Sequence, residues 1–290
     1  MSRSTQILGF LFAFGFLFSA YTKWIAPGYF EITVLEQDLV QTRTQAAHLT
    51  RFIIGLELGL GFCLLLPFYR KLLLVFAMLL ITGLSLHLLY LWSTGYDANC
   101  GCFGEMIAMT PLESLFKNML LLLLGAILYK RSKFQKRVPR FFVLVPLLFL
   151  LAPWVHLPIP NFDNLSFSSY THFEKAGRVD LNTGEQLVGV FNLDCEHCQQ
   201  LARELAKWEL EQQQKLPLYL LFFREGSTSV AQFEALTQSN YPYAFIDTNT
   251  FFSLIGESPP RIYHLINGEI MAYWDEDFIA GLESGGFDRE

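Results

Sequence analysis

The amino-acid sequence predicts an α-helical membrane domain followed by a water-soluble α/β domain. The first observation is composition: of 290 residues, 52% are hydrophobic and only 17% are charged, which is too apolar for an ordinary soluble protein. The second is charge placement, because residues 1–159 carry 13 Lys and Arg against 7 Asp and Glu, whereas residues 160–290 carry 8 against 20. Neither part has the clustered basic face that binds nucleic acid, so nucleic acid is excluded as a partner.

Apolar stretches in the first part of the chain predict five transmembrane helices, at Ile7–Ile25, Phe52–Phe68, Leu72–Trp92, Leu115–Tyr129 and Phe141–Val155. Most approach the ~20 residues that cross a ~30 Å hydrocarbon core, and the last two reach this length only with flanking residues. The first stretch is long and lacks the small-residue cleavage site of a secretory signal. We therefore expect the first helix to be retained.

The positions of Lys and Arg predict the orientation of these helices. If the helices alternate in direction, one side of the membrane holds the basic residues of the short loops: Arg3, Arg70, Lys71, Lys130, Arg131, Lys133, Lys136, Arg137 and Arg140. Basic loops mark the cytoplasmic side. The pattern favours a bacterial inner-membrane protein whose N-terminus is cytoplasmic and whose C-terminal domain is periplasmic.

The cysteines form two close pairs, Cys100 with Cys102 and Cys195 with Cys198, and leave Cys63 alone in the second apolar stretch. Both pairs lie on the predicted periplasmic side, where disulfides form and persist. Cys63 lies about twelve residues, or ~18 Å, inward from the outer end of its helix, too deep to exchange with either pair. We expect Cys63 to be a small buried apolar residue.

The C-terminal part shows alternating strand and helix patterns after a polar leading segment. A strand at 186–193 runs directly into Asp194-Cys195-Glu196-His197-Cys198 and a helix at 199–214. The Asn267-Gly268 pair between the last two strands is typical of a hairpin turn. The remaining expected elements are strands at 216–224, 243–247, 261–266 and 269–274, helices at 230–238 and 277–283, and a turn or short helix at 251–255.

The position of Cys195 at a helix N-terminus gives the pair a chemical meaning. The partial positive charge and free N–H groups there stabilise a thiolate and lower its pKa below the ~8.5 of a free thiol. Cys198, one turn further along, would then break the mixed disulfide, and His197 would add a positive or hydrogen-bonding influence. A zinc site needs four ligands, and no second Cys or His pair occurs in this domain. A permanent structural disulfide is the other interpretation.

The strand and helix order, with Cys-x-x-C at the first strand-to-helix junction, resembles the thioredoxin fold, and the Cys-x-His-Cys sequence resembles the active site of DsbA-type oxidants. This resemblance implies a thiol–disulfide oxidoreductase with an easily reduced disulfide. It also implies a cis-proline facing the disulfide, seven residues before Asn267, where Pro260 stands and Pro259 is the alternative. The backbone beside that proline would hold an extended substrate peptide.

The sequence also departs from the thioredoxin pattern at two positions. Thioredoxins carry a buried Asp six residues before the first cysteine and a Trp immediately before it. Here these positions are Gly189 and Asp194. The departure puts the proton relay of that family in doubt for this chain.

The sequence Cys100-Gly101-Cys102-Phe103-Gly104, before the fourth apolar stretch, resembles the loop of DoxX/MauE membrane proteins, and the likeness covers about residues 1–130. It implies a four-helix bundle. It further implies disulfide formation in periplasmic partners, so thiol or disulfide proteins are the expected partners. Because a Cys-x-Cys disulfide closes a tight ring, it should be readily reduced and suited to exchange with Cys195 and Cys198. A loop staple is the alternative.

Together these interpretations predict four segments. They are a DoxX/MauE-like membrane domain at residues 1–130, a basic cytoplasmic loop with a fifth transmembrane helix at 131–157, a linker at 158–177, and a periplasmic thioredoxin-like domain at 178–290.

Three polar residues of the predicted spans, Glu57, His87 and Lys117, lie at similar depth below the Cys-Gly-Cys loop. Ionisable groups inside a membrane are functional candidates by default, so these residues are candidates for a quinone site or a proton path. Hydrogen bonding between helices is the alternative for each. Quinone is thus the one candidate cofactor, and the sequence assigns no metal site.

Three functions therefore compete. The first is a disulfide relay, whose direction, client and electron acceptor the sequence leaves open. The second is copper handling, because Met106 and Met109 place soft ligands beside the Cys-Gly-Cys loop. The third is a structural subunit whose cysteines form only staples.

Overall fold

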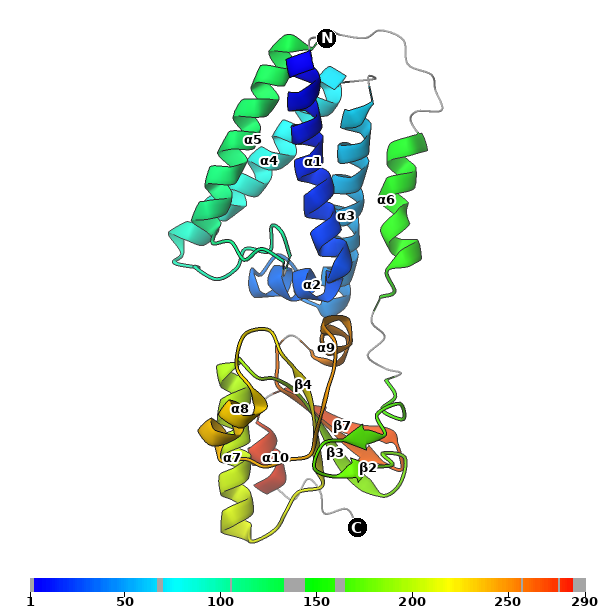
Figure 1. Ribbon diagram of the computed structural model, residues 1–290, viewed down its shortest axis with the longest axis vertical. Coiled ribbons are helices and arrows are strands. Elements are labelled where there is room, and N and C mark those ends of the chain that lie inside the picture. Colours follow the sequence, from blue (N-terminus) through cyan, green and yellow to red (C-terminus); the bar gives the residue numbers. More distant parts are fainter. Residues whose placement is uncertain are drawn as a thin grey trace. The chain divides into compact units, whose positions relative to one another are not determined.

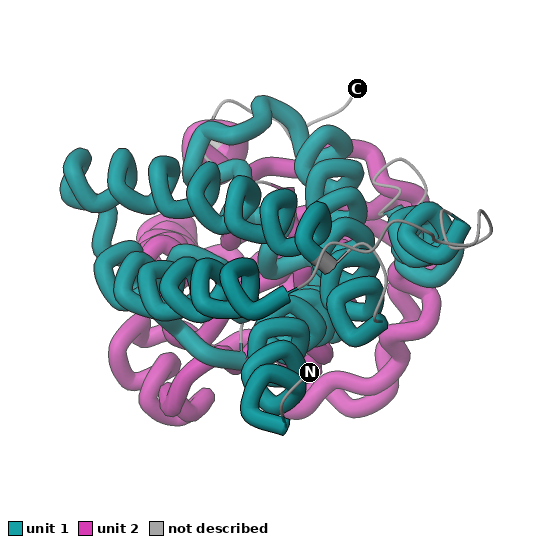
Figure 2. Tube along the Cα trace, turned by 90° about the horizontal axis from the view of Figure 1, so that it is seen from above, with its two compact units in different colours: residues 1–160 teal, residues 161–290 magenta. Residues whose placement is uncertain are grey.

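The computed structural model describes residues 3–66, 70–104, 106–132, 144–159, 165–256, 258–275 and 277–283. The chain divides into two compact units, Met1–Pro160 and Asn161–Glu290, which are considered separately below. Figure 2 colours the two units separately. The predicted basic residues at 133, 136, 137 and 140 lie outside the described residues.

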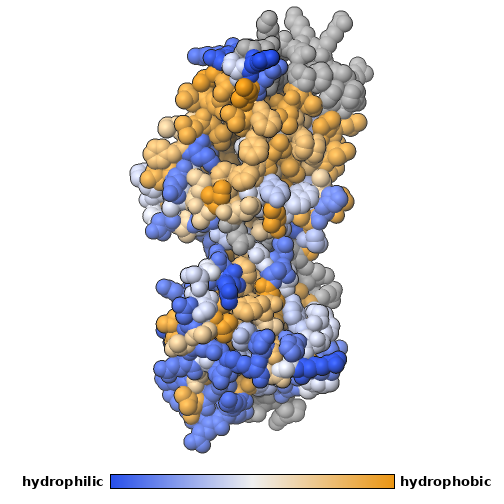
Figure 3. All heavy atoms as spheres, viewed as in Figure 1, coloured by the Kyte–Doolittle hydropathy of each residue, from blue (hydrophilic) through white to orange (hydrophobic). Residues whose placement is uncertain are grey.

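The first unit is built from α-helices (Figure 1). Four of them are long and apolar enough to cross a membrane: α1 (Arg3–Ile25), α3 (Arg43–Leu65), α4 (Arg70–Ser93) and α5 (Pro111–Arg131). Their outer surface is apolar, as Figure 3 shows, and side chains such as Leu79 and Leu86 are each 64% exposed. Side chains of this kind are stable at the surface only in contact with lipid or a partner. The predicted α-helical membrane domain is confirmed.

A shorter helix, α6 (Leu144–His156), covers most of the fifth predicted span. Its 13 residues are fewer than the ~20 that cross a bilayer, and the residues before it lie outside the described ones. It packs closely on α3, because a Cβ atom at Gly55 would lie only 2.5 Å from the carbonyl oxygen of Leu150. The fifth crossing itself stays a prediction.

One helix of this unit was not predicted from the sequence. The segment after the first span was expected to be a loop, but it forms α2 (Pro27–Glu36), which lies across the end of the long helices (Figure 1). Pro27 suits the first helical turn, where its missing N–H costs nothing. The helix buries both an apolar side chain, Val34, and an acidic one, Glu31, so its sequence lacks a clear amphipathic pattern.

Buried charges tie α2, α3 and the end of α6 together. Glu31 of α2 forms ion pairs with Arg43 and Arg51 of α3, at 3.2 and 2.7 Å. The Arg51 guanidinium also donates to the carbonyl oxygens of Leu157 and Pro158, just after α6. Breaking a buried pair of this kind leaves an uncompensated charge, so the cluster fixes the relative positions of the three helices.

The second unit is an α/β domain around a five-stranded mixed sheet, in the order β5-β4-β3-β6-β7. The central β3 runs parallel to β4 and antiparallel to β6, and β7 pairs antiparallel with β6. The strands are β3 (Glu185–Asn192), β4 (Leu218–Phe223), β5 (Tyr243–Phe245), β6 (Arg261–Ile266) and β7 (Glu269–Trp274). The helices are α7 (Glu196–Gln212), α8 (Val230–Thr237), α9 (Thr248–Leu254) and α10 (Phe278–Glu283).

This order and sheet confirm the predicted thioredoxin-like fold, with a core that includes Leu187, Phe191, Phe222 and Phe233. The structure adds a small hairpin that the sequence did not predict, β1 (His172–Phe173) with β2 (Gly177–Arg178), at the boundary between the expected linker and the expected domain. Two-residue strands are too short to show an alternating pattern.

Candidate functional site

Cys195 lies where the central strand β3 passes into helix α7. It occupies the N-cap position of α7 with extended backbone angles, and Glu196 begins the helix. Cys198 follows in the first turn and is fully buried, whereas Cys195 is partly exposed. The structure therefore places the Cys-x-x-C pair at the strand-to-helix junction that the sequence predicted, with the first sulfur accessible and the second covered.

The surroundings of Cys195 favour its thiolate. A hydrogen bond from the Cys198 thiol, the backbone N–H groups of Cys198 and His197, and the charge of His197 together outweigh burial and lower the pKa of Cys195 from 9.0 to about 6. Burial raises the pKa of Cys198 well above its usual value. The two thiols thus differ in the way that nucleophilic attack by Cys195 requires.

The predicted proline lies beside this sulfur. The peptide bond between Pro259 and Pro260 is cis, as the sequence predicted for Pro260. The Cys195 Sγ atom lies 3.9 Å from the carbonyl oxygen of Pro259. A backbone acceptor beside the nucleophile is the arrangement that an extended peptide substrate would contact.

The two departures from the thioredoxin pattern have structural explanations. At Gly189 of β3, a Cβ atom would lie 2.8 Å from both Leu220 and Phe191 side-chain atoms, so no carboxylate fits there. Asp194 instead accepts hydrogen bonds from the backbone N–H groups of Gly226 and Thr228, at 2.8 and 3.1 Å. Asp194 therefore ties the loop after β4 to the chain directly before α7.

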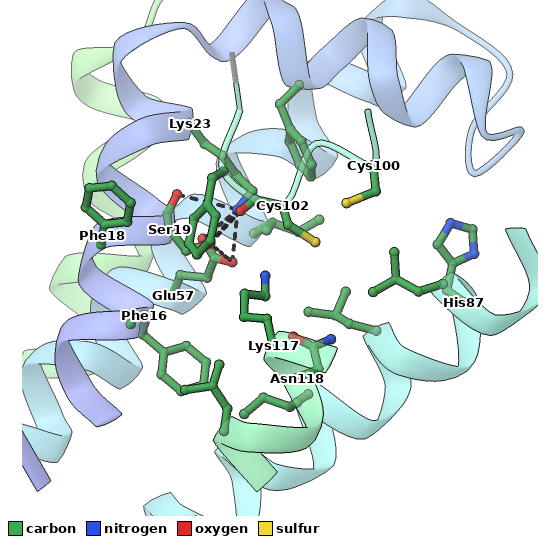
Figure 4. Close-up of a pocket in the computed structure, with 18 of the residues that line it drawn as sticks. Phe16, Phe18, Ser19, Lys23, Glu57, His87, Cys100, Cys102, Lys117 and Asn118 are labelled. Carbon is green, nitrogen blue, oxygen red and sulfur yellow. Dashed lines mark hydrogen bonds and ion pairs between the residues drawn. The ribbon is translucent and has the colours of Figure 1, made fainter. Parts of the chain in front are cut away.

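A second candidate site is a pocket of about 350 Å³ inside the membrane unit (Figure 4). Its wall includes Cys100 and Cys102 together with all three polar residues that the sequence singled out, Glu57, His87 and Lys117. Most of the remaining wall is apolar, with aromatic rings such as those of Phe14, Phe16, Phe18 and Phe103. The structure thus brings the intramembrane polar residues and the Cys-Gly-Cys loop to one place.

An ion pair closes one side of this pocket. The Lys23 ammonium of α1 donates to both carboxylate oxygens of Glu57 on α3, each at 3.2 Å, and to the carbonyl oxygen of Cys102 at 2.8 Å. Ser19 donates to Glu57 at 2.9 Å. Both charged side chains are almost completely buried. Glu57 is therefore a partner of Lys23 that anchors the Cys-Gly-Cys loop to α1 and α3.

The other two predicted residues face the pocket from α4 and α5. The His87 Nε2 atom lies 3.0 Å from the Gln37 Oε1 atom, so this side chain has a hydrogen-bonding partner. The Lys117 ammonium lies 4.3 Å from the centre of the Phe103 ring, and it makes no hydrogen bond or ion pair with the residues that the structure describes. In Figure 4, Lys117 points into the pocket toward Cys102.

The two thiols of the Cys-Gly-Cys loop lie in different surroundings. Cys100 is buried, and its sulfur lies 2.9 Å from the Ser114 hydroxyl. A hydrogen bond with Cys102, followed by burial, raises the pKa of Cys100. A hydrogen bond from Cys100 and the charge of Lys117 lower the pKa of Cys102 against the effect of burial. Cys102 is thus the more acidic thiol of this pair.

Comparison with known proteins agrees with these observations. Residues 1–131 match the family model of the methylamine utilisation protein MauE. Over 327 aligned positions, the chain is 26% identical to Protein TlpB of Flavobacterium psychrophilum, and the alignment covers 91% of this chain and 89% of that protein. No solved structure gives a significant match. The MauE match confirms the resemblance that the Cys-Gly-Cys-Phe-Gly sequence indicated.

Several residues of the pocket in the membrane unit were not singled out from the sequence: Ser19, Lys23, Gln37 and Asn118. Lys23 lies near the end of the first predicted span, Ile7–Ile25, and was assigned no role. A lysine in one predicted span and a glutamate in a later span together indicate a buried ion pair. Which two residues pair, however, depends on which helices pack together.

The copper-handling hypothesis relies on Met106 and Met109 beside the Cys-Gly-Cys loop. Met106 is 55% exposed, and the Met109 sulfur lies 3.9 Å from the Ser114 hydroxyl. Within the described parts of the chain, no group of three or more His, Cys, Asp or Glu side chains could hold a metal ion.

Proposed function

We propose that this protein is a membrane-bound thiol–disulfide oxidoreductase, in which Cys195 attacks and Cys198 resolves. The observation that carries the proposal is the Cys195 sulfur at the start of α7, with a pKa lowered to about 6 beside the Pro259 carbonyl. The alignment with the TlpB relative covers 91% of this chain and 89% of that protein, which supports one architecture shared by the two proteins.

The exchange follows from the two thiols. In the reducing direction, the Cys195 thiolate attacks a partner disulfide, forming a mixed disulfide and releasing one partner thiolate. Cys198 then loses its proton and attacks the Cys195 sulfur, which releases the second partner thiol and leaves the Cys195–Cys198 disulfide. The oxidising direction is the reverse. Proteins with exchangeable thiols or disulfides are therefore the proposed partners.

The Cys100 and Cys102 pair is proposed as the second redox pair. Cys102 borders the pocket as the more acidic thiol, and Cys100 lies two residues away with its sulfur on the same side of the loop (Figure 4). Asn99 supports this loop, since its side chain accepts hydrogen bonds from the backbone N–H groups of Gly101 and Met109. A supported loop with one nucleophilic sulfur suits disulfide exchange better than an exposed flexible one.

We place both pairs on the periplasmic side of a bacterial inner membrane. Within the membrane unit, the first residues of α1, the start of α4 and the end of α5 share one end, and the Cys-Gly-Cys loop lies at the other (Figure 1). Basic residues at the first end, such as Arg3 and Arg131, support a cytoplasmic assignment. Spheroplasts treated with a membrane-impermeant thiol reagent should label reduced Cys195 and Cys102. Labelling only after the membrane is opened would refute this orientation.

The activity is tested with the full-length protein purified in detergent and a dithiol peptide as substrate. Cys195→Ser should abolish peptide oxidation while the protein remains folded and abundant. Cys63→Ser is the matched control, because Cys63 is buried within α3 and belongs to neither close pair, and it should retain activity. If Cys195→Ser instead keeps its activity, or loses ~2–5 kcal/mol of stability as a removed structural disulfide would, the proposal is wrong.

A further inference from the structure

The pocket in the membrane unit has a composition that defines its ligand. Its wall is mainly apolar and aromatic, and its volume of about 350 Å³ falls in the range of sites for small molecules. The pocket belongs to helices whose outer surface is apolar, so a ligand that is soluble in the bilayer suits it.

The edge of the pocket reaches the lipid-facing surface of α1. Phe14 lines the pocket, is 50% exposed, and stacks between Phe10 and Phe18 along one face of the helix. Phe10 is 57% exposed and lies outside the pocket. An apolar molecule can therefore enter from the membrane along this row of aromatic rings.

The polar groups of the pocket are few and lie next to the reactive sulfur. The Lys117 ammonium projects into the pocket toward Cys102, and Cys102 borders the same space (Figure 4). Asn118 donates to the Ser85 hydroxyl at 3.1 Å, which holds its amide in place beside Lys117. The Phe103 ring lies 5.3 Å from the Phe18 ring, and the two form an aromatic wall. The site therefore offers a cation, a fixed amide and aromatic faces beside a dithiol.

We propose that this pocket binds a membrane quinone, which accepts electrons from the Cys100 and Cys102 dithiol. A quinone is apolar, stacks on aromatic rings, and carries carbonyl oxygens that accept hydrogen bonds from Lys117. An ordinary lipid chain would fill the apolar part but would leave the cation and the two thiols without a role. The inference rests on the proposed function in one respect, namely that Cys100 and Cys102 form a redox pair.

The step balances without any further reactant. Two S–H bonds break and one S–S bond forms between Cys100 and Cys102, which releases two electrons and two protons. The quinone takes up both electrons and both protons and becomes a quinol with two new O–H bonds. Lys117 stabilises the negative charge that develops on the quinone oxygen nearest to it. The Cys100–Cys102 disulfide is then available to oxidise another dithiol.

The test uses the full-length protein in lipid nanodiscs with Cys195→Ser and Cys198→Ser combined, so that Cys100 and Cys102 are its only close pair of thiols. The protein is reduced, freed of reductant, and mixed with decylubiquinone or menadione. At least one of these quinones should yield about one quinol per protein in a single turnover, together with loss of both thiols. No quinol from either quinone overturns the inference, including the case in which lipid alone fills the pocket. Because the Cys195→Ser, Cys198→Ser background lacks the other pair, the result does not depend on whether Cys195 exchanges disulfides as proposed above.

Variants of α5 show whether the reaction occurs in this pocket. Leu121→Trp fills the pocket and should slow quinol formation at least about tenfold. Leu123→Trp is the matched control, because Leu123 lies two residues away, is 61% exposed and does not line the pocket, and its rate should match that of the background protein. Equal rates for the two variants would contradict the assignment.

A second variant keeps the test valid if Leu121→Trp does not fold. Lys117→Met preserves the shape of the side chain without its charge and should slow quinol formation, whereas Lys117→Arg should restore most of the rate. A photoreactive quinone should also label peptides of the helices that line the pocket, α1 to α5, in the background protein. A normal rate for Lys117→Met, or labelling confined to segments that do not line the pocket, such as α6, would refute the role of this pocket.

Discussion

The thiol of Cys195 should titrate far below the range of an ordinary thiol. Its pKa is lowered from 9.0 to about 6, chiefly by the hydrogen bond from Cys198 and by the backbone N–H groups at the start of α7. At pH 7 this corresponds to about 90% thiolate, against about 1% for a thiol with the unshifted value. The reactive form is therefore already dominant at neutral pH.

The reaction rate alone does not reveal this shift. A thiolate of lower pKa is intrinsically less nucleophilic, and with a Brønsted coefficient of about 0.5 a three-unit shift costs roughly thirtyfold. The ~90-fold gain in thiolate at pH 7 is thus reduced to a net gain of about threefold. The midpoint of the pH profile, rather than the rate at one pH, is the decisive quantity.

The same shift stabilises the reduced form in a defined pH window. Because the pKa is lowered in the folded protein, the stabilisation is complete above pH 9.0 and is lost as the pH falls through about 6. At pH 7 it amounts to about 1.4 kcal/mol, or about 30 mV in the reduction potential of the Cys195–Cys198 pair. As the pH rises from 6 to 9, the Cys195–Cys198 disulfide should therefore become progressively easier to reduce than a disulfide whose cysteines have unshifted pKa values.

The assay is alkylation of the reduced full-length protein with iodoacetamide in brief pulses at a series of pH values. Mass spectrometry of the Cys195 peptide gives the labelling rate, and the midpoint should lie near pH 6. His197→Ala removes a smaller contribution and should raise the midpoint modestly. A midpoint near ~8.5, the value of a free thiol, would refute the reasoning.

Three further substitutions test contacts inside one unit or the other, each by unfolding of the full-length protein in detergent. Asp194→Ala removes the two hydrogen bonds to the loop after β4 and should lower the free energy of unfolding of the α/β domain in urea by about 1–3 kcal/mol. An unchanged urea midpoint would contradict the role given to this carboxylate. Glu57→Gln leaves the Lys23 ammonium buried without its counter-charge and should lower the stability of the membrane unit by ~3–5 kcal/mol. The thermal midpoint should fall accordingly, and an unchanged midpoint would show that the ion pair is exposed to solvent. Gly55→Ala should lower the free energy of unfolding by ~1–3 kcal/mol, because the added Cβ atom meets the backbone of α6. Gly83→Ala is the control and should be neutral or slightly stabilising, because a Cβ atom there has nothing within 4 Å. Equal effects of the two substitutions would exclude close packing of α6 at Gly55.

The sequence predicted those elements whose signal is local. The β6–β7 hairpin was predicted with its observed limits, because Asn267 and Gly268 both take the positive φ angles that this turn requires. The four long helices were predicted because membrane spans need continuous apolar residues. The Cys-x-x-C motif was placed at the start of a helix because a buried strand pattern ended directly before it.

The sequence did not predict features that depend on packing between distant segments. Helix α2 buries Glu31 in an ion-pair cluster with residues of α3, so a charge that suggests exposure is in fact enclosed. Lys23 lies near the end of the first predicted span, and its charge is neutralised by Glu57 of another helix. The pocket itself, which Glu57, His87 and Lys117 share with the two thiols, follows from helix positions that no single segment encodes.

The most direct measurement of the central claim is the trapping of mixed disulfides. With Cys198→Ser the resolving thiol is lost, so adducts at Cys195 persist and can be identified by mass spectrometry after quenching with acid. Full-length Cys198→Ser protein in its native membrane should carry partner proteins, or its own Cys100 or Cys102, linked through Cys195. The same experiment is repeated with the double variant Cys63→Ser, Cys198→Ser. If Cys195 is recovered only as a free thiol in both proteins, without any adduct, the result would contradict nucleophilic exchange at Cys195.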